Sequence, residues 1–160
     1  MRLVRDNLHA FQPDEQLLWC ILATTGMRRG EAWHIQGEKV ELGIRYVIVG
    51  TKSEASLRRV ALPADFLALY PGKITGLLFQ DSPVNVGKRL LRRIRALGIT
   101  EPSKVLHSLR HRAASRLRAC ECPEKTQNWI LGHEEITIPD GYGKGPPVSL
   151  LKRWIDEIGM

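Results

Sequence analysis

Apolar residues recur every three or four positions along much of the chain, which is the spacing of one face of an α-helix. Residues 13–25 show this spacing; the segment opens with Pro13 and two acidic residues, and Gly26 follows it. Proline and acidic side chains favour the first turn of a helix, and glycine favours its end. We therefore predict a helix over residues 13–25. Its apolar face comprises Leu17, Leu18, Ile21 and Leu22.

The same periodicity predicts further helices. In residues 83–97, apolar positions alternate with basic ones, so this helix has one apolar and one positively charged face. Residues 148–158 form another amphipathic segment with a clear apolar side. The full set of further predicted helices is 28–35, 64–70, 83–97, 106–119, 124–131 and 148–158.

Two segments, residues 40–49 and 57–62, are instead rich in β-branched and apolar residues. The polar residues 50–56 lie between them, which predicts an antiparallel hairpin of two strands. Residues 136–147 contain three glycines and three prolines, and we expect a mobile loop there. The predicted fold class is mainly α with a small antiparallel β-sheet (α+β).

Length and composition narrow the class of protein. The chain has 160 residues, the size of one domain, and 43% of them are hydrophobic, which is enough to form a core. A membrane-spanning helix needs about 18 or more consecutive apolar residues, and no such run is present. The N-terminus lacks the apolar stretch of a secretory signal, and three cysteines without framework spacing fit a reducing compartment. We therefore expect a cytoplasmic protein with no membrane partner.

Positive charge is concentrated in one part of the chain. The formal net charge is +7, and residues 88–118 contain ten basic side chains against the single acid Glu101. The rest of the chain is slightly acidic. A polyphosphate partner such as nucleic acid would be attracted to such a segment, although a solvated helix face has a similar composition.

His107, Arg110 and His111 follow one another at helical spacing and share one face. An arginine fork binds two phosphate oxygens and a histidine donates or accepts a proton, so the pattern suits a phosphoryl centre. Two alternatives remain open at this point. Histidines four residues apart can bind zinc, although no glutamate follows His107 and no third ligand stands nearby, and a His–Arg pair can be purely structural.

Four more residues are candidates for the same chemistry. Arg28 follows a predicted helix end, and Glu31 is placed to fix it, although such a pair is also a common surface salt bridge. Lys52 lies in the predicted hairpin turn, where exposed lysines are frequent. His133 follows a short helix that it could simply cap. Tyr142 lies between glycines, where a tyrosine can also be an ordinary surface residue.

Together these residues resemble the catalytic domain of the tyrosine recombinase (phage integrase) family, over about residues 8–158. The resemblance rests on five motifs in the family's order: Arg28 within Thr-Gly-x-Arg-x-x-Glu, a hairpin Lys52, His107-x-x-Arg110, Leu-Gly-His133, and Tyr142 nine residues later. The sequence departs from the family at Pro139 and Gly141, where polar residues are more frequent.

The resemblance implies a role for each motif residue. Tyr142 is expected to attack a scissile DNA phosphate, and Arg28 and Arg110 to hold its non-bridging oxygens. His107 and His133 are expected to hydrogen-bond the phosphate and assist proton movement, and Lys52 to protonate the departing 5′-hydroxyl. The DNA-binding candidates are Lys88, Arg89, Arg92, Arg93 and Arg112.

The implied function is that of a site-specific recombinase or integrase of a prophage or other mobile element, bacterial or phage-encoded. It would cut and rejoin double-stranded DNA at a recombination site through a 3′-phosphotyrosyl intermediate, with no metal, ATP or other cofactor. A homo-oligomer is expected on DNA and a monomer for the isolated domain. The alternatives are a catalytically inactive DNA-binding remnant or regulator, and a type IB topoisomerase-like strand-passage enzyme.

The resemblance also predicts a domain organisation. Residues 1–160 would be a single catalytic domain that lacks the family's N-terminal core-binding domain, with residues 1–12 as a linker remnant. Residues 134–147 would be a mobile loop carrying the nucleophile. Residues 148–160 would be a C-terminal helix that packs either on its own domain or on a neighbouring subunit.

Overall fold

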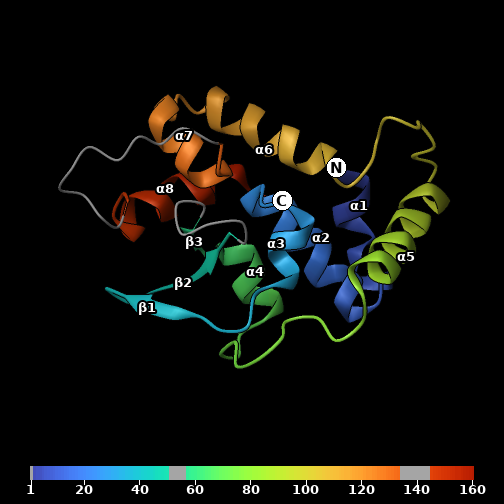
Figure 1. The fold of residues 1–160 in the computed structure, drawn as a ribbon. Helices are drawn as coiled ribbons and strands as arrows, with labels where there is room; N and C mark the ends of the chain where they lie inside the picture. Colours follow the sequence, from blue (N-terminus) through green and yellow to red (C-terminus); the bar gives the residue numbers. More distant parts are fainter. Residues whose placement is uncertain (1, 51–56, 134–144) are drawn as a thin grey trace.

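A computed structural model describes residues 2–50, 57–133 and 145–160 of the chain. Within these residues, helices surround a central helix, and a small sheet lies at the opposite end of the molecule from α5 (Figure 1). The helices are α1 (Arg2–Asp6), α2 (Pro13–Thr25), α3 (Arg29–Trp33), α4 (Ala64–Leu69), α5 (Pro83–Ala96), α6 (Ser108–Ala119), α7 (Glu124–Leu131) and α8 (Val148–Ile158), with a 3₁₀ turn η1 (Leu8–Ala10). No helix in the described residues is both long enough and apolar enough to cross a membrane.

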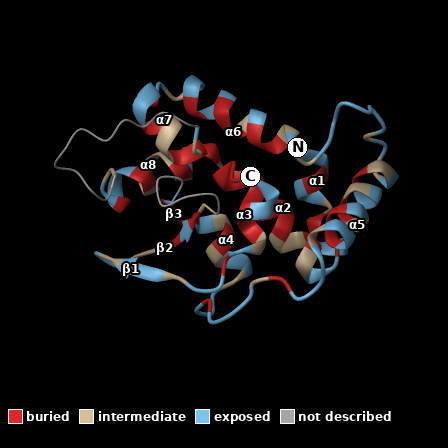
Figure 2. Ribbon diagram, in the orientation of Figure 1, coloured by how far each residue is buried: buried red, intermediate tan, exposed pale blue. Residues whose placement is uncertain are grey.

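Helix α2 is the centre of the core. It begins at a capping box in which the backbone N–H of Gln12 donates to Glu15, and Pro13 occupies the first helical position, as the sequence predicts. From Leu18 to Thr25 every residue is buried (Figure 2), because α3, α4, α5, α6 and α8 all pack around it. A helix enclosed on all sides has no polar face, so its sequence is almost uniformly apolar there.

Gly26 ends α2 in a left-handed conformation with φ of 66°. A Cβ at this position would lie 2.7 Å from the Cβ of Ala113 in α6 and 2.9 Å from a methyl of Leu131 in α7. Glycine is therefore required both by the backbone angle and by the close approach of two helices. The segment that carries Arg28 is thereby fixed directly against α6 and α7.

The sheet has three antiparallel strands in the order β1 (Lys39–Glu41), β2 (Ile44–Val49) and β3 (Arg58–Ala61), with Tyr46 opposite Ala61. The predicted pairing of β2 with β3 is confirmed, but the prediction of one strand over residues 40–49 is wrong. Leu42 and Gly43 both have positive φ, 51° and 78°, and make a tight turn that splits this segment into two strands. Only Gly43 is a usual turn residue, so the sequence signal was weak.

The two ends of the described chain both pack on the same core. Within residues 1–12, the predicted linker remnant, α1 and η1 form, and Val4, Leu8 and Phe11 are buried. Helix α8 buries Val148 and three further apolar residues and contacts β3, α2 and α6. Its apolar side is thus covered by its own domain.

Candidate active site

A buried carboxylate, Glu31, connects two of the arginines near the end of α2. Arg28 caps α3: its backbone N–H donates to Oε2 of Glu31 at 2.7 Å, and its Nη1 donates to Oε1 at 3.1 Å. Arg58, from β3, donates to the same two oxygens at 2.7 and 2.9 Å. Although burial alone would raise the pKa of Glu31, the hydrogen bonds and charges of Arg58 and Arg28 lower it overall. Glu31 is therefore ionised and holds both guanidinium groups.

Arg58 is a site residue that the sequence analysis did not identify. It is 5% exposed, and its Nε donates to the carbonyl of Ile130, near the end of α7, at 3.1 Å. A Cβ on Gly132 would lie 2.5 Å from Nη1 of Arg58, so only glycine fits beside this guanidinium. The one available signal was a pair of arginines, Arg58 and Arg59, in an otherwise apolar strand segment, and nothing in the sequence tells which of the two is buried. Arg58 thereby connects β3 to α3 and to the end of α7. Strand β3 is the one that follows Lys52 in the sequence.

Arg28 reaches a distant segment of the chain. Its Nη2 donates to the carbonyl of Gly132 at 3.0 Å, next to His133. The side chain of Arg28 is 49% exposed, whereas that of Glu31 is 7% exposed. The guanidinium is thus anchored on its inner side and open to a ligand on its outer side.

Arg110 lies in the first turn of α6 and is buried. Its Nη1 donates to the carbonyl of Gly26 at 2.9 Å, at the end of α2. Burial, and then the charges of Arg28 and Arg58, lower the pKa of Arg110 to about 10, which still leaves it protonated at neutral pH. Three guanidinium groups therefore lie around one carboxylate, and this excess positive charge favours an anion.

The two candidate histidines lie in the field of these arginines. Partial loss of contact with water lowers the pKa of His107, as do the charges of His111, Arg110 and Arg28. Partial loss of contact with water and the charges of Arg110, Arg28 and Arg58 lower the pKa of His133. Both imidazoles are exposed and are held towards the neutral form, in which one ring nitrogen donates and the other accepts a hydrogen bond.

The structure thus brings four of the six predicted catalytic residues, Arg28, His107, Arg110 and His133, into one region with Glu31. Lys52 and Tyr142 lie outside the described residues, as does most of the predicted loop at 134–147. No cluster of three or more potential metal ligands occurs in residues 2–50, 57–133 and 145–160. His107 and Arg110 also line a cleft of about 380 Å³ between α3, α5 and the segment before α6.

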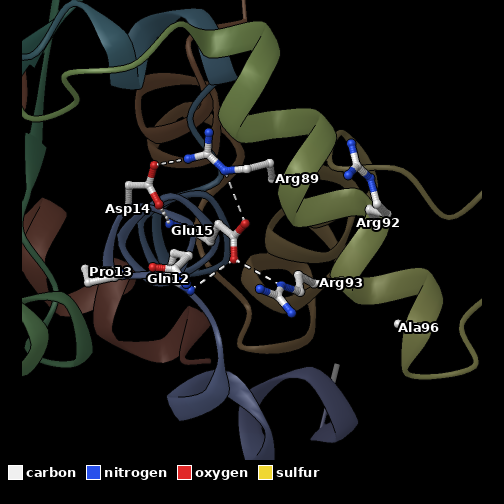
Figure 3. Close-up of a pocket in the computed structure, with 8 residues that line it drawn as sticks. All are labelled: Gln12, Pro13, Asp14, Glu15, Arg89, Arg92, Arg93 and Ala96. Carbon is white, nitrogen blue, oxygen red and sulfur yellow. Dashed lines mark hydrogen bonds and ion pairs between the residues drawn. The ribbon is translucent and has the colours of Figure 1, made fainter.

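Two of the DNA-binding candidates are engaged in a different cleft. Arg89 and Arg93 project from α5 towards Asp14 and Glu15 at the start of α2 (Figure 3). Arg89 is hydrogen-bonded to Asp14 and lies 3.5 Å from Oε1 of Glu15, and Nε of Arg93 lies 3.7 Å from Oε2 of Glu15. This cleft of about 900 Å³ is larger than the first, but carboxylates pair with two of its three arginines, Arg89 and Arg93.

The other three DNA-binding candidates differ among themselves. Arg112 is partly buried and donates to the carbonyls of Ala23 and Gly159 at 3.2 and 2.9 Å, near the ends of α2 and α8. It therefore holds helices together. Lys88 and Arg92 are exposed on α5.

Comparison with known proteins shows similarity in structure rather than in sequence. No family model matches the chain, and no curated protein matches it either. An integrase from mycobacterium phage Brujita superimposes with a TM-score of 0.74 at 18% identity, over 96% of this chain and 55% of that protein. The XerH site-specific recombinase, bound to its difH substrate in a pre-cleavage complex, has a TM-score of 0.68 at 23% identity, over 84% of this chain and 45% of that one. A post-cleavage complex of XerH with palindromic difH gives a TM-score of 0.68 as well.

The chain therefore has the fold of the tyrosine recombinase catalytic domain, as the order of its motifs predicts. It spans about half the length of the solved structures that it matches.

Proposed function

We propose that this chain is the catalytic domain of a tyrosine-type site-specific DNA recombinase, such as the integrase of a prophage or another mobile element. The observation that carries the proposal is the convergence of Arg28, Arg110, His107 and His133, from distant segments of the chain, around the Glu31–Arg58 pair. The fold, which is that of recombinase catalytic domains, agrees with it.

The arginines act on the charge of the phosphate. A phosphodiester is anionic and repels a nucleophile, and more negative charge accumulates on its non-bridging oxygens during attack. Arg28 and Arg110 are fixed in advance by Glu31 and by backbone carbonyls, so their orientation costs little when the DNA binds. Their remaining N–H groups donate to the two non-bridging oxygens.

The histidines complete the set of hydrogen bonds. Because the pKa of each is lowered, His107 and His133 are mainly neutral near pH 7 and can accept as well as donate a proton. A tyrosine hydroxyl has a reference pKa of about 10 and needs such an acceptor nearby to attack at neutral pH. One imidazole takes up the phenolic proton and the other hydrogen-bonds the phosphate.

Tyr142 and Lys52 supply the covalent chemistry in this proposal. The oxygen of Tyr142 forms a bond to phosphorus while the bond from phosphorus to the 5′-oxygen breaks, and Lys52 gives its proton to the departing 5′-oxygen. The phosphotyrosyl bond conserves the energy of the phosphodiester, so attack by another 5′-hydroxyl rejoins a strand without ATP. The partner is a double-stranded recombination site, on which copies of the protein assemble.

The test is to trap the covalent intermediate. A duplex nicked just beyond the scissile phosphate loses its short 5′-hydroxyl fragment after cleavage, so the protein stays attached. We expect the wild type to form the adduct, with Tyr142 as the attached residue in peptide mass mapping, and Tyr142→Phe to bind DNA without forming it. Tyr70→Phe removes a hydroxyl elsewhere and is the matched control, expected to react normally.

An adduct formed by Tyr142→Phe, or one mapped to another residue, would contradict the proposal. Absence of any adduct together with intact DNA binding would favour the DNA-binding remnant. Relaxation of supercoiled plasmid without recombination between two sites would favour the topoisomerase-like alternative. The two assays run in parallel separate these functions.

A further inference from the structure

The cleft beside His107 and Arg110 extends beyond the residues that the proposed reaction uses. Its other basic side chains are Arg29, the first residue of α3, and Lys88 on α5, and its walls include the apolar residues Met27 and Leu106. None of the described residues that line it is acidic. Arg29 and Lys88 are both exposed, and neither takes part in a side-chain hydrogen bond or ion pair within the described residues.

A glycine on α5 makes room for Arg29. A Cβ on the buried Gly87 would lie 2.9 Å from Nη1 of Arg29 and 3.6 Å from its Cδ. The guanidinium therefore lies against the helix backbone at Gly87, next to Lys88 in the sequence. Two cationic side chains from different elements therefore line one cleft, and no carboxylate among the described residues that line it compensates their charge.

We propose that Arg29 and Lys88 form a second phosphate-binding site, which takes the DNA phosphate next to the scissile one on the same strand. The inference rests on the proposed function, since His107 and Arg110 line this cleft and also belong to the candidate active site. A DNA strand carries one phosphate charge about every 3.4 Å along the helix axis, so a strand held at the active site presents its next phosphate nearby. Arg29 offers a planar fork to two phosphate oxygens, and Lys88 offers a point charge.

The site would align the strand and not take part in bond breakage. Its occupation sets the position of the scissile phosphate relative to Arg28 and Arg110, which is the geometry that proximity effects require. Loss of Arg29 or Lys88 is therefore expected to change the DNA concentration needed for half-maximal cleavage more than the rate at saturating DNA.

The experiment measures binding of a fluorescein-labelled nicked duplex by anisotropy at several salt concentrations between about 50 and 200 mM. We expect Arg29→Ala and Lys88→Ala each to weaken binding. Each should also make the negative slope of log K against log salt shallower by about one, because each removes one phosphate contact. Lys125→Ala removes one positive charge from an exposed position on α7, outside the cleft, and is expected to keep the slope of the wild type.

Gly87→Ala tests the position of the Arg29 guanidinium separately from its charge. It leaves the net charge unchanged, favours the helix, and displaces only the flexible end of Arg29. We expect it to weaken binding as Arg29→Ala does, and Arg29→Lys to recover part of the binding that Arg29→Ala loses. Equal binding by Gly87→Ala and the wild type would overturn the placement of the phosphate, and an equal effect of Lys125→Ala and Arg29→Ala would overturn the site.

Adduct formation on the same duplex keeps the two proposals apart. A wild-type adduct together with unchanged DNA affinity of Arg29→Ala and Lys88→Ala overturns the second phosphate site and leaves the recombinase proposal standing. No wild-type adduct, with the predicted losses of binding in these variants, overturns the recombinase proposal and leaves a phosphate site on a DNA-binding domain.

Discussion

Two clefts among the described residues are lined by basic side chains of α5 and its neighbours, and they differ in how those charges are compensated. In the larger, Arg89 and Arg93 face Asp14 and Glu15 and form ion pairs with them (Figure 3). In the smaller, Arg29, Lys88 and Arg110 share the lining with His107 and with no carboxylate. The larger cleft thus resembles a salt-bridged helix contact, whereas the smaller one is left with positive charge that a phosphate can use.

The comparison teaches that a local count of charge does not locate a binding site. Residues 88–118 carry the whole excess of positive charge in the sequence, yet several of their arginines bind carbonyls or carboxylates of the same chain. At Glu31 the positive charge is not compensated, although a carboxylate is present. Glu31 holds the guanidinium groups of Arg28 and Arg58 in place, but with Arg110 nearby one carboxylate faces three positive charges.

The largest effect is expected where an ion pair is most deeply buried. Arg58→Ala removes two hydrogen bonds to the buried Glu31 and is expected to lower the free energy of unfolding by about 3–5 kcal/mol. Arg58→Lys should recover part of the lost stability, because it restores the positive charge but not the planar guanidinium that binds both carboxylate oxygens. Urea denaturation measures both. Arg89→Ala, which breaks the partly exposed pairs of the larger cleft, should cost clearly less, and an equal loss in the two alanine variants would contradict the contrast between buried and exposed pairs.

The next effect concerns catalysis. Arg110→Ala removes a donor at the proposed transition-state charge, and such a loss typically slows a reaction about 100- to 1,000-fold. Arg89→Ala should keep the cleavage rate at saturating DNA, because its charge is used by Asp14 and Glu15. Single-turnover adduct formation on the nicked duplex measures both rates. If the two variants were slowed equally, the smaller cleft would have no special place in the chemistry.

The smallest effect is on the pH dependence of stability. The pKa values of His107 and His133 are lowered in the folded chain, so below about pH 6.5, the ordinary value for histidine, the unfolded chain binds more protons. Acidification from pH 7 to 5.5 should therefore destabilise the protein. His133→Gln should reduce this dependence, as measured by urea denaturation at the two pH values. A dependence unchanged in both His107→Gln and His133→Gln would show that the pKa of neither imidazole is lowered in the folded chain.

The sequence predicted the elements well where local signals are strong. The bounds of α2 and α7 agree with the prediction, because Gly26 and Gly132 adopt left-handed conformations at their ends, and β2 pairs with β3 as expected. The turn at Leu42–Gly43 was missed because a leucine is uncommon with positive φ.

The sequence predicted the site only in part. The motif residues Arg28, His107, Arg110 and His133 are brought together, as the resemblance implied. The pairing of Arg58 with Glu31, 27 residues away, and of Arg89 with Asp14, 75 residues away, depends on packing that no local pattern encodes. The contacts of Arg112, a predicted DNA-binding residue, with the carbonyls of Ala23 and Gly159 likewise join residues distant in the sequence.

The central claim is that Arg28 and Arg110 act by neutralising the non-bridging oxygens of the scissile phosphate. The most direct measurement compares adduct formation by Arg110→Ala on two nicked duplexes, one with a normal scissile phosphate and one with an uncharged methylphosphonate in its place. We expect the variant to be strongly impaired on the phosphate and to recover activity on the methylphosphonate, which has no charge for Arg110 to neutralise. An equal defect of Arg110→Ala on both substrates would contradict the claim.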